Sequence, residues 1–146
     1  MLPLDDAVRR PFEGLVSALL SQQHLPAPVL ELCRLRLAQL HGVPASVAEL
    51  GIAVAPAQRE NLADWHRHSA FDARDRACLA FTEVYAADAQ AITDALADAV
   101  KAQCGDAGLV ALIEALGLLD GLLRTERLWR GINPGGGGSD VDAAAR

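Results

Sequence analysis

Every long hydrophobic pattern in this 146-residue chain has the period of an α-helix. Apolar side chains recur three and four residues apart, no segment alternates apolar and polar residues over several positions, and β-branched residues are sparse. The hydrophobic content of 51%, rich in alanine and leucine, supports a packed core. A domain of this length buries roughly 70% of the surface that its unfolded chain exposes. The sequence therefore predicts a single all-α domain.

The expected helices can be placed from local start and stop signals. Pro11 suits a first turn, Gly42 a C-terminal stop and Asp72 an N-cap. The helices are expected over residues 11–21, 28–41, 44–50, 57–65, 72–87, 92–104 and 106–129, about six to seven in all. The last of them has apolar residues on most sides and is expected to be central. The domain spans residues 1–133, and the Gly- and Ala-rich tract 134–146 is expected to be a flexible tail.

The most specific pattern lies in the expected helix 28–41 and the residues after it. That helix carries Glu31, Arg36 and Gln39 and stops at Gly42. It resembles the core motif of the alkylhydroperoxidase D and carboxymuconolactone decarboxylase superfamily, in which the glycine leads into a Cys-x-x-Cys pair with a histidine four residues after the second cysteine. The resemblance covers residues 25–134, more weakly outside the motif. It implies an alkylhydroperoxidase D-like helical bundle that assembles as a homodimer, trimer or hexamer.

The chain departs from this motif at its reactive positions. Val43 and Ser46 stand where the family has its two cysteines, and Leu50 stands where it has the histidine. The family's peroxidases need two sulfurs, one to attack the peroxide and one to condense with the resulting sulfenic acid. The family also implies a proton relay through the glutamate and histidine, of which this chain keeps only Glu31. Thiol peroxidase activity of the family type is therefore predicted to be lost.

Three cysteines occur elsewhere in the chain. Cys33, Cys78 and Cys104 lie in separate segments without C-x-x-C or C-x-x-H spacing. Each is interpreted first as a small buried apolar residue. Cys104 is the best candidate for an exposed thiol because a helix is expected to end there. The sequence leaves open that two of these thiols meet in space.

Charge and cysteine usage limit the class of protein. The formal net charge is −6 and the basic residues are dispersed, which argues against nucleic acid as a partner. An odd cysteine count without framework spacing favours a reducing compartment. No convincing signal peptide or membrane-length uncharged span is present in the sequence. A cytoplasmic protein without membrane contact is expected.

The motif supplies the candidate site residues. Glu31 is either a carboxylate paired with an arginine such as Arg34, or a pocket carboxylate tuned as a general base. His41 ends the expected helix, where a cation is favourable, and is close enough in sequence to face the vacated cysteine position. Ser46 would need a base beside it to act as a nucleophile. The candidate catalytic set is therefore Glu31, His41 and Ser46.

The remaining motif positions are candidates for binding. Arg36 and Gln39 are expected to hold helices together, and Val43 and Leu50 to line any pocket at the vacated site. Metal binding by His66 and His68 is not expected, because residues two apart on a helix point away from each other. No cofactor is expected.

Three functions follow as alternatives. The first is a redox-dead scaffold that binds a small hydrophobic or carboxylate ligand or serves in assembly. The second is a cofactor-free acid–base enzyme, acting on a lactone or carboxylic acid as the decarboxylase branch does, with Glu31 central and His41 assisting. The third is a residual thiol antioxidant that uses Cys33, Cys78 or Cys104.

Overall fold

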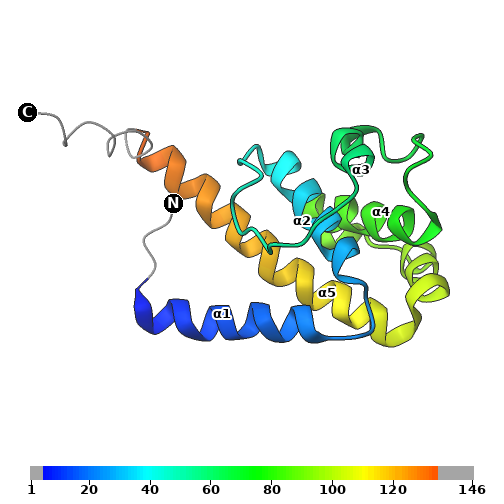
Figure 1. Ribbon diagram of the computed structural model, residues 1–146, viewed down its shortest axis with the longest axis horizontal. Coiled ribbons are helices and arrows are strands. Elements are labelled where there is room, and N and C mark those ends of the chain that lie inside the picture. The colour runs from blue at the N-terminus through cyan, green and yellow to red at the C-terminus, as the bar shows by residue number, and fades with distance from the viewer. Residues whose placement is uncertain (1–4, 135–146) are drawn as a thin grey trace, which may run out of the picture.

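The computed structural model describes residues 5–134. Over this range the chain forms five α-helices and two single-turn 3-10 helices, and no strand (Figure 1). They are α1 (Asp6–Ser21), α2 (Ala27–His41), α3 (Pro56–Glu60), η1 (Leu62–Asp64), α4 (Ala73–Ala87), η2 (Ala89–Ala91) and α5 (Asp94–Ile132). The all-α class is confirmed, with five α-helices where about six to seven were expected. Except for Pro134, the expected tail lies outside the described residues.

The core forms where α2, α4 and α5 contact one another pairwise. The most buried helix is α2, which buries side chains on nearly every side. The last expected helix lies within α5, which contacts both α2 and α4. A second hydrophobic cluster joins α2 and α4 to η1. In contrast, α5 leaves four large apolar residues exposed, namely Val110, Ile113, Leu128 and Ile132. The motif helix therefore lies in the interior, which places its polar residues among apolar neighbours.

Two predicted helix ends are confirmed. Gly42 ends α2 in the left-handed conformation, at φ 65°, where its amide donates to the carbonyl oxygens of α2. Asp72 and Asp75 form a reciprocal capping box at the start of α4. Both ends are therefore set by local residues, as the sequence predicts.

The long helix α5 is interrupted at Gly105. The backbone there has φ 72° and ψ 177°, which no helix contains, so two helical segments meet at a kink. This conformation is essentially restricted to glycine. The break falls at the position predicted from the sequence between 104 and 106.

The first helix begins earlier than predicted. Asp5 caps α1 by accepting a hydrogen bond from the Ala7 amide at 2.8 Å, and Pro11 lies inside the helix rather than in its first turn. Proline at this position leaves the Ala7 carbonyl without its helical donor. Ala7 is exposed, so water can replace that donor. Only Leu19 of α1 is fully buried, and α1 runs along one edge of the molecule (Figure 1).

Two further helix predictions are wrong. Residues 44–50 form turns instead of a helix, with Ala48 at φ 54° and Gly51 at φ 69°. The helix expected over 57–65 divides into α3 and η1 at Asn61. The Asn61 side-chain amide donates to the Ala57 carbonyl at 2.8 Å and so competes with the helical pattern.

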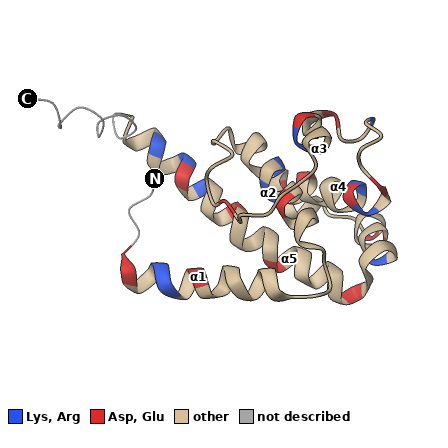
Figure 2. Cartoon of the chain, in the orientation of Figure 1, with Lys and Arg blue, Asp and Glu red and all other residues tan. Residues whose placement is uncertain are grey.

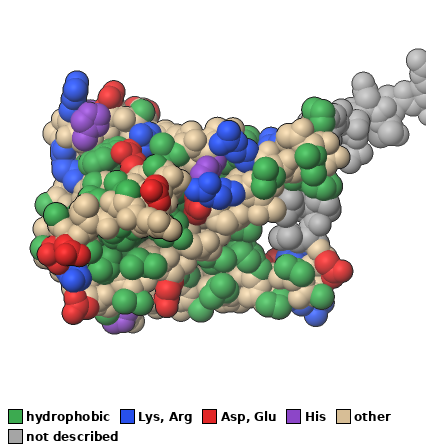
Figure 3. Space-filling view, turned by 180° about the vertical axis from the view of Figure 1, so that it is seen from behind, with side chains coloured by type: hydrophobic (Ala, Val, Ile, Leu, Met, Phe, Trp, Pro, Cys, Tyr) green, Lys and Arg blue, Asp and Glu red, His purple; other side chains and the backbone are tan. Residues whose placement is uncertain are grey.

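Charged residues of both signs are interspersed along the described chain (Figure 2). Hydrophobic side chains are exposed between charged ones over the lower half of the opposite face (Figure 3).

Candidate functional site

The Glu31 carboxylate forms a buried, two-point ion pair with Arg34 of the same helix. Nε of Arg34 lies 2.8 Å from Oε2 and Nη2 lies 2.7 Å from Oε1. Both side chains are 1% exposed. The paired alternative for Glu31 is therefore the one that the structure contains. Both carboxylate oxygens are occupied, which speaks against a general base at this position.

Arg34 also fixes the turns that follow α2. Its Nη1 donates to the carbonyl oxygens of Ala45 at 2.7 Å and of Val47 at 2.6 Å. A charge-assisted hydrogen bond of this kind is stronger than one between neutral groups. These bonds hold residues 45–47 as turns against α2, which accounts for the missing helix at 44–50. The Glu31–Arg34 pair thus anchors the backbone of residues 45–47.

A second polar chain starts at His41. Nε2 of His41 lies 2.5 Å from Oδ1 of Asp120, and Oδ2 of Asp120 lies 2.6 Å from Nε of Arg124. Arg124 in turn donates to the carbonyl of Ala86 at 2.7 Å. The i, i+4 spacing of Asp120 and Arg124 favours their ion pair, whereas no local spacing indicates the His41 contact. These hydrogen bonds join α2, α5 and the end of α4, and they engage the His41 side chain with Asp120.

Arg36 and its neighbours connect α2 to α4. Nε of Arg36 lies 2.7 Å from Oε1 of Glu83, which also accepts the indole N–H of Trp65 at 2.8 Å. Arg36 donates as well to Oε1 of Gln39 at 2.8 Å. The structure therefore gives Arg36 the helix-joining role expected of it, with Glu83 as an acceptor that the sequence did not point out.

The candidate residues Val43, Ser46 and Leu50 have different surroundings. Val43 is buried, Leu50 is half-buried, and Ser46 is exposed. No hydrogen bond of the Ser46 hydroxyl is found within residues 5–134, and the carboxylate and imidazole that could serve it are engaged elsewhere. The three candidate catalytic residues are not brought together.

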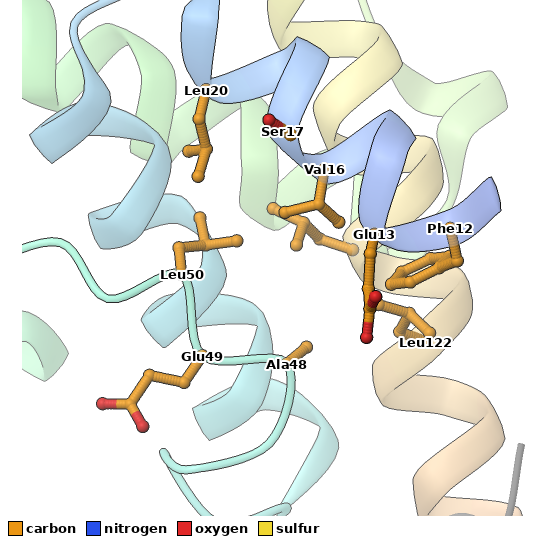
Figure 4. Close-up of a pocket in the computed structure, with 10 residues that line it drawn as sticks. Phe12, Glu13, Val16, Ser17, Leu20, Ala48, Glu49, Leu50 and Leu122 are labelled. Carbon is orange, nitrogen blue, oxygen red and sulfur yellow. The ribbon is translucent and has the colours of Figure 1, made fainter. Parts of the chain in front are cut away.

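A first cavity, here called the α1 cavity, lies between α1, α5 and the turns before Gly51 (Figure 4). Its volume is about 340 Å³. Its lining is mostly apolar and consists of Phe12, Glu13, Val16, Ser17, Leu20, Ala48, Glu49, Leu50, Leu119 and Leu122. The side chain of Glu13 points into the cavity beside Leu122, whereas that of Glu49 points away from it (Figure 4). The lining is therefore apolar apart from Glu13, Ser17 and Glu49, which are all exposed residues.

A second, smaller cavity, here called the Val43 cavity, lies between α2, α3 and the turn after Gly42. Its volume is about 230 Å³, and it is lined by Leu35, Ala38, Gln39, Val43, Ala45, Arg59 and Leu62. Gln39 and Arg59 provide polar groups at its edge, the chemistry that a carboxylate would need. Neither cavity is lined by Glu31, His41 or Ser46.

The three thiols lie where α2, α4 and α5 meet. Cys33 and Cys78 are buried in the core, and Cys104 packs partly exposed against it, as expected for the most exposed of the three. Burial raises the pKa of the Cys33 thiol to about 12 and raises the pKa of the Cys78 thiol as well. A high pKa leaves a thiol un-ionised and slow to react at neutral pH.

Within residues 5–134, no group of three or more His, Cys, Asp or Glu side chains is placed to hold a metal ion. No helix in the same range is long and apolar enough to cross a membrane.

Comparisons with known proteins identify no family for this chain. No family model matches this chain, and no curated protein is significantly similar to it.

Sequence reasoning missed the residues that line the α1 cavity. Helical spacing predicts Phe12, Leu15, Val16, Leu19 and Leu20 as the core side of the first helix. Leu19 is buried and Phe12, Val16 and Leu20 line the cavity, but Leu15 is 54% exposed, so the prediction is wrong for that residue. The helix covers a cavity instead of closing on the core, however, and periodicity cannot distinguish the two.

Proposed function

We propose that this chain is a degenerate member of the alkylhydroperoxidase D-like superfamily that binds a small, largely apolar molecule in the α1 cavity. The observation that carries the binding proposal is a cavity of about 340 Å³ with a mostly apolar lining, to which the exposed Glu13 contributes a carboxylate beside Leu122. Ligand sites in proteins commonly measure about 300–1,000 Å³ and combine an apolar lining with few polar groups. The cavity is therefore large enough for a ligand of one or two rings.

The assignment to this superfamily rests on the motif residues of α2. Leu50, at the position where the family has its histidine, lines the α1 cavity. An aliphatic side chain there supplies apolar contact in place of a proton relay. With the Glu31 carboxylate engaged by Arg34, binding is favoured over the acid–base reaction.

Glu13 sets the polar character of the ligand. Its carboxylate accepts hydrogen bonds and, when ionised, attracts a positive charge. A ligand with an apolar body and an ammonium or other donor group complements the α1 cavity better than a carboxylic acid does. Octylamine should therefore bind more tightly than octanoic acid, and Glu13→Gln should reduce that difference.

The test is a fluorescence titration with N-phenyl-1-naphthylamine, a neutral apolar probe that brightens when it leaves water. Val16→Trp fills the α1 cavity and should weaken binding by about tenfold or more, equivalent to roughly 1.4 kcal/mol. Leu15→Trp is the matched control, because Leu15 lies on the same helix and is 54% exposed. Unchanged affinity in the Val16 variant, or no binding by the unmodified protein, would contradict the proposal.

A further inference from the structure

The side of α5 that faces away from the core is exposed from Val110 to Leu128. Six residues recur along it at intervals of four, three, four, three and four, which places them on one stripe of the helix. This stripe, here called the α5 stripe, consists of Val110, Glu114, Gly117, Gly121, Arg124 and Leu128, all of them exposed. The residues of α5 that pack into the core, such as Leu112 and Leu119, lie on the opposite side. The α5 stripe lines neither cavity, so it is independent of the proposed ligand site.

The centre of the α5 stripe has no side chains. A Cβ added at Gly121 would meet nothing within 4 Å, and one added at Gly117 would meet only the Tyr85 hydroxyl at 3.6 Å. Packing within the chain therefore requires neither glycine. Glycine is a poor helix former, so two of them on an exposed face favour the close approach of a second helix. Val110 and Leu128, at the two ends of the stripe, are large exposed hydrophobic residues of the kind that such a contact buries.

Two opposite charges lie on either side of the glycines. The Glu114 carboxylate forms no hydrogen bond or ion pair within residues 5–134. Arg124 donates through Nε to Asp120 and through Nη2 to the carbonyl of Ala86, and its Nη1 bonds to nothing in the same range. Ten residues of helix, about 15 Å, separate Glu114 from Arg124, so the two cannot pair within one copy.

We infer that the α5 stripe binds a second copy of this chain, with the two α5 helices antiparallel and crossing at their glycines. The intervals along the stripe read the same in both directions, because they are centred on residue 119. A two-fold axis at that level therefore places Gly117 of one copy opposite Gly121 of the other. The same axis places Val110 opposite Leu128, so that apolar side chains meet at both ends of the contact.

The charges decide the direction of the two helices. In the antiparallel arrangement, Glu114 of each copy lies opposite Arg124 of the other, which gives two pairs of opposite charge. In a parallel arrangement each of these residues would lie opposite its own counterpart, and like charges repel. Arg124 can make the contact through Nη1 while its other nitrogens keep Asp120 and the Ala86 carbonyl. The α5 stripe is thus complementary to itself only in the antiparallel direction.

The test is sedimentation equilibrium of the full chain from low micromolar to submillimolar concentration. The unmodified protein should approach twice the mass of one chain. Glu114→Arg sets like charges opposite each other at two places and should raise the dissociation constant of the dimer by about tenfold or more. Asp98→Arg is the matched control, since Asp98 is an exposed acidic residue of α5 that lies before the kink and outside the stripe. It should leave the dimer unchanged.

Two further variants test the glycine contact and the direction of the helices. Gly121→Leu should abolish the dimer and leave the helix content of the separate copy unchanged by circular dichroism, because the added Cβ meets nothing within 4 Å. Glu114→Gln should weaken an antiparallel dimer, whereas it would strengthen a parallel one by removing a repulsion. A chain that stays single at every concentration would overturn the inference. So would a dimer that Glu114→Arg and Gly121→Leu leave intact, or that Glu114→Gln strengthens.

Discussion

The ion pairs of α2 differ in burial, and their contributions to stability should differ accordingly. Glu31 and Arg34 are each 1% exposed, whereas Arg36 and Glu83 are 16% and 31% exposed. Removing one partner of a buried pair leaves an uncompensated charge, which costs roughly 3–5 kcal/mol. A partly exposed pair contributes about 1 kcal/mol or less.

Arg34→Met should therefore lower the free energy of unfolding by roughly 3–5 kcal/mol, because it leaves Glu31 buried without its partner. Arg36→Met, the control on the same helix, should cost about 1 kcal/mol or less. Urea denaturation followed by circular dichroism measures both. Equal losses in the two variants would show that the Glu31–Arg34 pair is not the anchor described above.

Contacts between charged side chains were predictable where both residues lie on the same helix. The pairs Glu31–Arg34 and Asp120–Arg124 follow from spacings of three and four residues. The contact between His41 and Asp120 spans 79 residues and depends on how α2 crosses α5, which no local pattern encodes. The same limit applies to the hydrogen bonds from Arg34 to the turn carbonyls.

At the scale of elements, the kink at Gly105 is the least replaceable backbone feature. An L-residue at φ 72° and ψ 177° is strained, at a cost of about 1–3 kcal/mol. Gly105→Ala should lower the free energy of unfolding by that amount. Gly121→Ala is the control, since it lies within the helical part of α5 with nothing within 4 Å of the added Cβ. That variant should gain up to about 1 kcal/mol.

Thermal or chemical denaturation of the two glycine variants measures both changes in the free energy of unfolding. A Gly105 variant as stable as the unmodified protein would mean that α5 can straighten through residue 105.

Helix ends were predictable where a residue has one dominant conformational preference. Gly42, Asp72 and Gly105 each ended or began a helix as predicted. The prediction of a helix over residues 44–50 was wrong because the side chain of Arg34 donates hydrogen bonds to the carbonyl oxygens of Ala45 and Val47. Tertiary hydrogen bonds of that kind override local preference.

At the scale of the whole molecule, the sequence predicted the all-α class but not the positions of the two cavities. The three cysteines looked unrelated because they lie far apart in the chain, yet the packing of α2, α4 and α5 gathers them. The α1 cavity likewise depends on the turns at 48–50, which were expected to be helical. Both features arise from the arrangement of helices and not from the composition of any one of them.

Assembly as a homo-oligomer stays a prediction. Among the described residues, the end of α5 carries Leu128 and Ile132 at 70% and 72% exposure. Apolar side chains of this size on the surface are consistent with a contact between copies.

The most direct test of the proposed function is a methyl-labelled NMR experiment that locates the bound probe. With N-phenyl-1-naphthylamine added, intermolecular nuclear Overhauser effects should reach the methyl groups of Val16 and Leu50, which line the α1 cavity. The methyl groups of Leu35 and Val43, which line the other cavity, should show none. Contacts at Leu35 and Val43 alone, or none at all, would contradict a ligand site beneath α1.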